Sequence, residues 1–321
     1  MRYAARILGA FVICGLAGVA HSQNFPTKPI QLIVPFTPGG GMSDRVARLI
    51  ADKFREKWGQ PGVVDNRPGA SANIGGEYVA RAPADGYTLL VAGDNPLVIN
   101  KALFPKLAYD PEAFTPVSIV VKSPLILAVH PAVPARNLEE LLAYAKAKPD
   151  SLNLGSNGTG SNMHLSLELL KMETGVRITH VPYKGVPNAL TDLVGGQIQM
   201  MFVGLGTVLQ QMKAGKLRVI AVASEKRMAA LPDVPAISEV VPGFVTETWF
   251  AVVAPAKTPP GIAARLSEVI AEMVRAPDTL RLLETLSVEG VGSTPEETAK
   301  FLKEETVRWS KVIRTTGVKA E

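Results

Sequence analysis

The fold is first indicated by residues 30–50, which read IQLIVPFTPGGGMSDRVARLI. The mostly apolar run Ile30–Val34 predicts a buried strand. Proline and glycine then interrupt the pattern, and from Val46 onward apolar residues recur at the spacing of one helix face. A strand, a glycine-rich turn and a helix in this order are typical of α/β proteins.

The same unit recurs along the rest of the chain, where short apolar runs alternate with amphipathic patterns. We expect strands at Ile30–Val34, Thr88–Ala92, Leu125–His130, Leu152–Gly155, Ile178–Val181, Ile198–Val203, Leu217–Ala223 and Phe250–Ala254. Asn137 with Glu140, and Thr294 with Glu297, have the spacing of capping boxes that begin helices. The sequence therefore predicts an α/β fold of parallel sheets covered by helices on both faces.

The length of 321 residues is sufficient for two α/β lobes. Short apolar strands meet around Lys122-Ser123-Pro124, and another strand follows a proline-punctuated stretch that ends near Val245. If the chain crosses between lobes at both places, residues 23–122 and 246–321 form lobe 1. Residues 123–245 then form lobe 2 as an insertion.

The first 22 residues have the pattern of a secretory signal peptide. Arg2 and Arg6 precede an apolar stretch from Ile7 to Ala20, and small side chains precede the site after Ser22. We expect cleavage there and export to the periplasm. An uncleaved membrane anchor is the alternative.

Composition excludes several classes of function. The single cysteine, Cys14, lies inside the signal, so disulfides, thiolate metal sites and cysteine catalysis are not expected in the mature chain. Loss of Arg2 and Arg6 lowers the formal net charge from +5 to +3. The remaining basic residues are scattered among acids, which argues against a nucleic-acid partner.

Two glycine-rich loops contain the main candidates for a binding site. The first runs from Pro35 to Asp44, and the second, from Leu154 to His164, reads LGSNGTGSNMH. Such loops present backbone N–H groups at the positive end of a helix, which suits a carboxylate or a phosphate. Either loop alone is compatible with an ordinary strand-to-helix turn. Two loops at matching positions of two lobes favour a site for a small anion.

Motifs for nucleotide binding are incomplete. Asp44 and Met163 stand where a dinucleotide-binding motif has its third glycine. Gly215-Lys216 is followed by Leu217, whereas a phosphate-binding P-loop has Ser or Thr there. No nucleotide cofactor is expected.

Catalytic and metal-binding patterns are equally sparse, because the mature histidines lack metal-ligand spacing. The competing hypothesis is a periplasmic hydrolase that uses Ser156 or Ser161 with His164. Residues on one helical turn seldom align for proton transfer, so a receptor is preferred over an enzyme.

Three polar residues have two interpretations each. His164 is either a polar wall of the cleft or a structural histidine. Asp44 either caps the first helix or faces the cleft and accepts a ligand's amino or hydroxyl group. Tyr183 and Lys184 lie in a third loop at a strand end, where Lys184 either pairs with a carboxylate or remains exposed.

Six groups of residues occur in a recognisable order along the mature chain. They are Val34-Pro35-Phe36 with Pro38-Gly39-Gly40 and Asp44, Asn66-Arg67-Pro68-Gly69, Asp85-Gly86-Tyr87-Thr88-Leu89-Leu90, His180-Val181-Pro182-Tyr183-Lys184-Gly185, Leu231-Pro232-Asp233-Val234-Pro235, and Trp249-Phe250 with Ala254-Pro255. Together they resemble the Bug family, the extracytoplasmic solute receptors of tripartite tricarboxylate transporters.

This resemblance implies a type II periplasmic-binding-protein fold, the Venus flytrap, whose two lobes close on a small carboxylate. It places on the two walls of the cleft Phe36, Thr37, Gly39, Gly40 and Asp44 on one side, and Asn157, Thr159, Ser161 and His164 on the other. It also implies a monomer that delivers its ligand to membrane transporter subunits. A ligand-sensing partner of a membrane kinase is a further alternative.

The sequence departs from the family pattern at three places. The stretch from Phe36 to Asp44 is one residue longer, and Ser71-Ala72-Asn73 replaces a glycine pair. Val203 stands where an aspartate often follows a Met-Phe pair, which would remove a polar group from the cleft. We therefore expect a less amine-bearing or more apolar acid than an amino-acid receptor binds.

Overall fold

The strands of the computed structural model follow one hydrogen-bonded path, β2-β1-β3-β9-β4-β7-β5-β6, with β8 and β10 paired to β4. The structure describes residues 25–39 and 41–320, so the predicted signal peptide and Gly40 lie outside the described residues. The strands are β1 (Ile30–Val34), β2 (Gly62–Asn66), β3 (Thr88–Ala92), β4 (Thr115–Val129), β5 (Asn153–Ser156), β6 (Thr179–Pro182), β7 (Met200–Gly204), β8 (Arg218–Val222), β9 (Glu247–Ala254) and β10 (Glu289–Gly290).

Helices lie between most of these strands. The α-helices are α1 (Met42–Trp58), α2 (Asn73–Ala80), α3 (Asn100–Leu103), α4 (Leu138–Ala147), α5 (Asn162–Thr174), α6 (Val186–Val194), α7 (Leu205–Lys213), α8 (Pro260–Arg275), α9 (Pro277–Thr285) and α10 (Pro295–Thr316). Shorter helical turns are η1 (Ala70–Ala72), η2 (Asn95–Ile99), η3 (Pro111–Ala113) and η4 (Ile237–Glu239).

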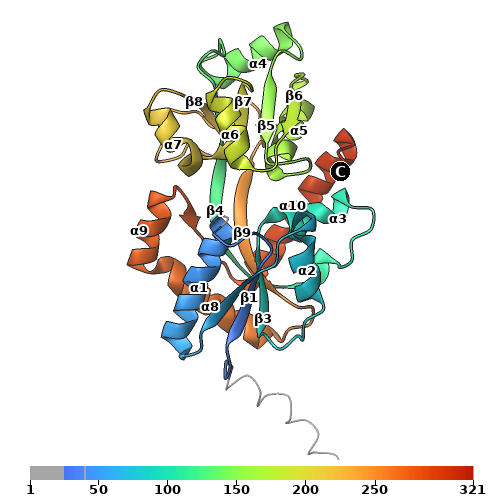
Figure 1. Ribbon diagram of the computed structural model, residues 1–321, viewed down its shortest axis with the longest axis vertical. Coiled ribbons are helices and arrows are strands. Elements are labelled where there is room, and N and C mark those ends of the chain that lie inside the picture. Colours follow the sequence, from blue (N-terminus) through green and yellow to red (C-terminus); the bar gives the residue numbers. More distant parts are fainter. Residues whose placement is uncertain (1–24, 40, 321) are drawn as a thin grey trace, which may run out of the picture.

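Two lobes share the long strand β4. Its residues from Thr115 to Pro124 pair with β9, whereas Leu125 to Val129 pair with β7 and β8. We call lobe 1 the sheet β2-β1-β3-β9-β4-β10 with α1–α3 and α8–α10, and lobe 2 the sheet β8-β4-β7-β5-β6 with α4–α7. Figure 1 shows β4 and β9 running between the lobes.

The expectation of wholly parallel sheets is wrong at the centre of the molecule. β9 pairs antiparallel with β3 and β4, and β4 pairs antiparallel with β7 and β8. The physical reason is that β4 and β9 lead the chain between the lobes in opposite directions. Parallel pairing is found for β1 with β2 and β3, and for β5 with β6 and β7.

Apolar helix faces cover both sides of the lobe 1 sheet. Phe54 of α1 and Ile270 of α8 are fully buried in one cluster, and Trp309 of α10 is fully buried in another. Burial of each such side chain contributes about 1.5–3 kcal/mol. The predicted caps are present as well, since Asn137 Oδ1 accepts from the Glu140 N–H at 2.8 Å and Thr294 forms a capping box with Glu297. These contacts fix the sheet whose strand ends carry the first glycine loop.

Candidate functional site

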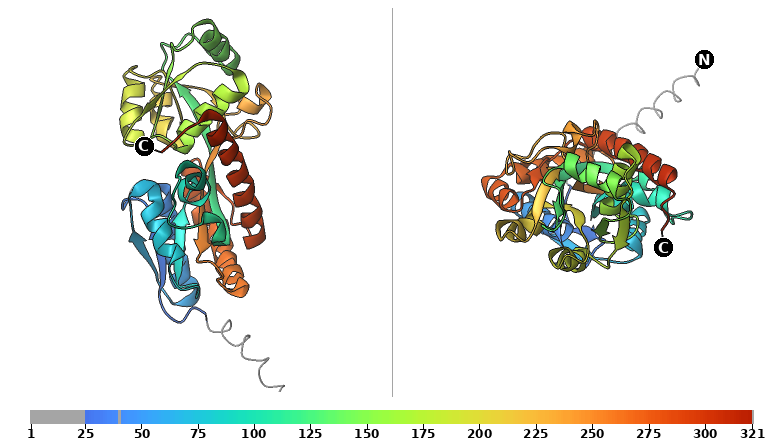
Figure 2. Two further views of the ribbon diagram at one scale, coloured as in Figure 1. Left: turned by 90° about the vertical axis from the view of Figure 1, so that its right-hand side faces the viewer. Right: turned by 90° about the horizontal axis from the view of Figure 1, so that it is seen from above.

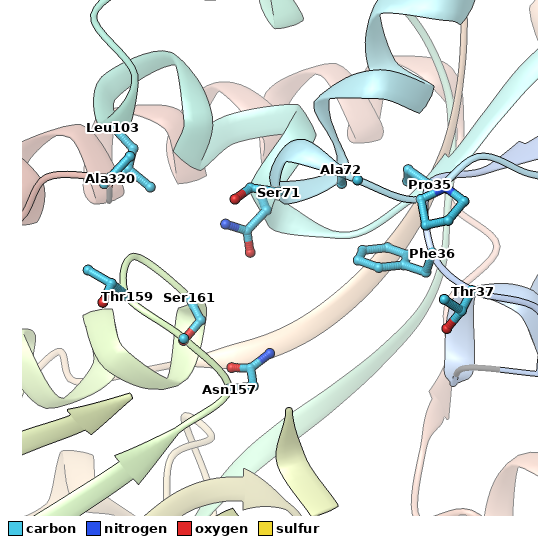
Figure 3. Close-up of a pocket in the computed structure, with 14 residues that line it drawn as sticks. Pro35, Phe36, Thr37, Ser71, Ala72, Leu103, Asn157, Thr159, Ser161 and Ala320 are labelled. Carbon is cyan, nitrogen blue, oxygen red and sulfur yellow. The ribbon is translucent and has the colours of Figure 1, made fainter. Parts of the chain in front are cut away.

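A cavity of about 500 Å³ lies between the lobes, at the ends of the two glycine loops (Figure 3). Lobe 1 contributes Pro35, Phe36, Thr37, Pro68, Gly69, Ser71, Ala72, Asn95 and Leu103. The remaining lining residues are Asn157, Gly158, Thr159 and Ser161 of lobe 2, and Ala320 after α10. Volumes of this size are typical of sites for small molecules.

Neutral groups alone line this cavity among the described residues. Its polar side chains are hydroxyls and amides, and no Lys, Arg, His, Asp or Glu is among its lining residues. α5 begins at its edge, where Ser161 Oγ accepts a hydrogen bond from the His164 N–H at 3.3 Å and caps the helix. An anion here would be bound by neutral donors and a helix N-terminus.

Asp44 lies behind the first loop and does not line the cavity. Its carboxylate is buried and accepts hydrogen bonds from Arg48 at 2.8 Å, from the Asn66 amide at 2.9 Å and from the Gly39 N–H at 3.2 Å. The hydrogen bond from Arg48 is the largest effect that lowers the pKa of Asp44. Asn66 Nδ2 also donates to the Phe36 carbonyl at 3.0 Å. Asp44 therefore braces the loop, and the helix cap position is taken by Gly41, which has no side chain to cap with.

A stacked histidine pair, the buried His164 and the half-buried His180, supports the second loop from behind. The rings of His164 and His180 stack with their centroids 3.6 Å apart and their planes 5° apart. His164 Nδ1 accepts from the Gly160 N–H at 3.0 Å, and its Nε2 lies 3.5 Å from Glu168 Oε1. Burial, followed by the electrostatic effect of the neighbouring His164 ring, lowers the pKa of His180 to about 4. Thus His164 positions the loop backbone and does not line the cavity.

The serine and histidine of the hydrolase hypothesis are not arranged for catalysis. Ser156 is fully buried, and its Oγ lies 2.6 Å from Nε2 of His180, whereas the hypothesis pairs it with His164. The same hydroxyl is within hydrogen-bond distance of the backbone of Gly158, at 3.0 and 3.1 Å. Ser161 Oγ is used to cap α5. The hydroxyls of Ser156 and Ser161 therefore support the conformation of this loop.

The third loop and Val203 lie outside the cavity lining. The Tyr183 hydroxyl donates to Asp192 Oδ2 at 2.7 Å, and burial, together with this acid, raises the pKa of Tyr183 to about 12. Lys184 is exposed. Val203 is buried in the lobe 2 core at 1% exposure, so a polar residue at this position would not reach the described cavity.

Sequence reasoning missed the part of the lining between Pro68 and Ala72, as well as Asn95, Leu103 and Ala320. A signal for the first part was visible, since Asn66-Arg67-Pro68-Gly69 is one of the six groups of residues and the departure at Ser71 directly follows it. Leu103 and Ala320 carry no such signal. They join the cavity only through the packing of α3 and α10.

Residues 25–39 and 41–320 contain neither a cluster of metal-ligand side chains nor a membrane-spanning helix. None of these residues forms a group of three or more His, Cys, Asp or Glu side chains that could hold a metal ion. None of the helices in this part of the chain is long and apolar enough to span a membrane.

Two α/β lobes joined by two strands, with an uncharged cavity between them, are the architecture of solute-binding receptors. The chain belongs to the tripartite tricarboxylate transporter family of receptors, whose family model matches residues 46–318. The resemblance to the Bug family, the two-lobed fold and the preference for a receptor over an enzyme are confirmed by this match and by the relatives described next.

Similar proteins cover nearly the whole chain. Protein BugT of Bordetella pertussis is 37% identical over 98% of this chain and 97% of its own length. The solved structure of Rpa4515 from R. palustris with adipate has a TM-score of 0.80 and 38% identity, covering 92% of this chain and 99% of that one. The structure of MatC from Rhodopseudomonas palustris with bound malate has a TM-score of 0.77 and 33% identity, covering 90% and 100%.

Proposed function

We propose that this protein captures a small organic carboxylate between its lobes and delivers it to the membrane subunits of a tripartite tricarboxylate-type transporter. The observation that carries the proposal is the uncharged cavity at two glycine loops and the N-terminus of α5. The adipate and malate named for the two similar structures are both small carboxylates, which supports this ligand class.

Neutral donors are sufficient for this task. A hydrogen bond from a neutral group to an ionised oxygen contributes about 1.5–3 kcal/mol, and a helix N-terminus adds about 0.3–1 kcal/mol. A few such contacts in a closed cleft reach a free energy of about −8 kcal/mol, which corresponds to micromolar affinity. A receptor also gains from moderate affinity, because it must release its ligand.

Lobe closure would complete the site, because the loops from Phe36 and from Asn157 belong to different lobes. We propose that β4 and β9 bend where they pass from one lobe to the other. The lobe boundaries then lie after residue 122 and after residue 245, as expected from the sequence. Export by the signal peptide and action as a monomer in the periplasm belong to the same proposal.

The test is binding of organic acids to the mature chain, measured by thermal denaturation and calorimetry. At a hundredfold excess over its dissociation constant, the correct acid should raise the free energy of unfolding by about 2.7 kcal/mol. The matched neutral diamides should have no effect. If mono-, di- and tricarboxylates at millimolar concentration all leave the melting temperature unchanged, the proposed ligand class is wrong.

Two variants locate the site. Asn157→Ala changes an exposed side chain that lines the cavity, and we expect about a tenfold loss of affinity. Lys184→Ala changes an exposed side chain outside the lining and should leave affinity unchanged. The opposite result would place the ligand at the third loop.

A further inference from the structure

The segment after α10 returns to the boundary between the lobes and reaches the cavity. α10 ends at Thr316, and Gly317 turns the chain with a left-handed φ of 70°, its N–H donating to the Ile313 carbonyl at 2.9 Å. Ala320 then lines the cavity. Figure 2 shows this dark red end of the chain beside the gap between the lobes.

This C-terminal segment, residues 317–320, is attached by alternate side chains. Val318 and Ala320 are half-buried and pack against the large apolar cluster, whereas Lys319 between them is exposed. An extended chain presents successive side chains to opposite sides, which explains the alternation. Two small apolar contacts therefore hold the wall that Ala320 forms.

Leu103 forms the neighbouring part of the same wall and is held more firmly. It is the last residue of α3, is 4% exposed and lines the cavity. It packs directly on the second glycine loop, because a Cβ added at Gly160 would lie 2.3 Å from Leu103 Cδ2. Figure 3 shows Leu103 and Ala320 at one end of the cavity, and Phe36 and Thr37 at the other.

The wall formed by Leu103 and Ala320 differs in chemistry from the glycine loops. A carboxylate is stabilised by N–H and hydroxyl groups of the glycine loops near Thr37 and Asn157, away from Leu103 and Ala320. The Leu103 and Ala320 side chains carry no donor, so they suit the methylene chain of an acid. The extent of that chain is limited by contact with these two residues.

We propose that Leu103 and Ala320 determine the length of the acid that the cavity accepts, and that the C-terminal segment is the adjustable part of this wall. The inference rests on the proposed function and specifies its ligand as an aliphatic acid with a short apolar chain. A single methylene group in an apolar pocket changes binding by about 10- to 200-fold, which is enough for selection by length.

The test is calorimetric titration of the mature chain with the linear monocarboxylates from butyrate to octanoate, whose far end is apolar. Ala320→Phe fills the apolar end, and the affinity for the longest acid that the wild type binds should fall at least tenfold relative to the shortest. Deletion of residues 318–321 opens this end and should shift the optimum toward longer acids. Lys319→Ala alters the exposed side chain of the same segment and should keep the wild-type order.

The outcomes separate the inference from the proposed function. If the wild type binds the series and Ala320→Phe and the deletion both keep its order of affinities, the inference is overturned while the proposed function stands. If no acid of the series binds but another carboxylate raises the melting temperature, the inference is overturned and the proposed function stands. If no mono-, di- or tricarboxylate binds, both fail. Circular dichroism verifies folding of each variant, and if the deleted chain does not fold, Ala320→Phe alone decides.

Discussion

At the scale of single residues, the polar side chains that looked most like ligand contacts support the loops. The Asp44 carboxylate accepts hydrogen bonds from Arg48, Asn66 and the Gly39 N–H. His164 accepts one from the Gly160 N–H. The polar part of the cavity lining consists of backbone, hydroxyl and amide groups. Such a division keeps the site uncharged while its loops remain fixed.

The stacked histidine pair predicts a pH-dependent stability. Burial and the neighbouring His164 lower the pKa of His180 from its ordinary 6.5 to about 4. Below pH 6.5 the His180 side chain is protonated in the unfolded chain, whereas in the folded protein it becomes protonated only near pH 4. The contribution of neutral His180 to the free energy of unfolding is therefore complete above pH 6.5 and is lost as the pH falls toward 4. Because His180 is only half-buried, we expect a loss of about 1–2 kcal/mol.

Urea denaturation at pH 7.5 and pH 5 checks this contribution. The difference between the two pH values should shrink by about 1–2 kcal/mol in His180→Asn. His130→Asn, the same change outside the stacked pair, should keep the wild-type difference. Equal differences in all three proteins would contradict the assignment.

At the scale of elements, the turn η1 between β2 and α2 is backbone-strained beside the cavity. Ala70, Ser71 and Ala72 have left-handed φ values of 47°, 54° and 72°, which residues other than glycine rarely adopt. The Asn100 side chain holds the turn, with its Nδ2 donating to the Ser71 carbonyl at 2.8 Å. Strain of this kind is retained where it positions functional groups, here Ser71 and Ala72 in the cavity wall.

An alanine-to-glycine change, made once in η1 and once in α10, tests the strain. Ala70 is exposed, so Ala70→Gly removes the steric cost without loss of packing and should stabilise the protein by about 0.5–1 kcal/mol. Ala299, exposed within α10, is the matched control, and Ala299→Gly should destabilise by about 1 kcal/mol. Thermal denaturation of both variants gives the signs. A loss of stability in Ala70→Gly would show that the turn is not strained.

At the scale of the whole molecule, side chains join the lobes beside the two crossing strands. Asn162 of lobe 2 donates from Nδ2 to the buried Asp94 carboxylate of lobe 1 and to the Glu247 carbonyl at 3.0 Å. Asn95 Nδ2 donates across the same boundary to the Gly160 carbonyl at 3.3 Å. The base of the second glycine loop is thereby tied to lobe 1.

The Asp94–Asn162 contact predicts energetic coupling between the lobes. Burial raises the pKa of Asp94 to about 6, so above that pH an ionised carboxylate depends on Asn162. Asn162→Ala should lower the free energy of unfolding by about 2–3 kcal/mol at pH 7.5. The loss should be smaller at pH 5, because a protonated carboxyl group without a partner destabilises the fold less than an ionised one.

A double-mutant cycle of Asp94→Ala and Asn162→Ala, followed by urea denaturation, measures the coupling. We expect a coupling energy of about 1–3 kcal/mol at pH 7.5. Asn157→Ala, in the same loop but exposed at the cavity, should be additive with Asp94→Ala. Additivity of the first pair would mean that the contact does not join the lobes in solution.

Local patterns made much of this molecule predictable. The strand Ile30–Val34, the first glycine loop and the helix after it are set by neighbours within a few positions, and the structure contains β1 and α1 there. The helix caps at Asn137 and Thr294 also depend on residues only three positions apart. Among the predicted site residues, Phe36, Thr37, Asn157, Thr159 and Ser161 line the cavity.

The sequence by itself determined the α/β class, the two glycine loops and the family, because periodicity and motif spacing are properties of short stretches. Only the tertiary structure decided that β4 and β9 run antiparallel between the lobes and that Asp44 and His164 stand behind the loops. It alone brought Ser71, Leu103 and Ala320 to one cavity. The reason is physical: those positions depend on the packing of segments far apart in the chain, and no local pattern of residues encodes such packing.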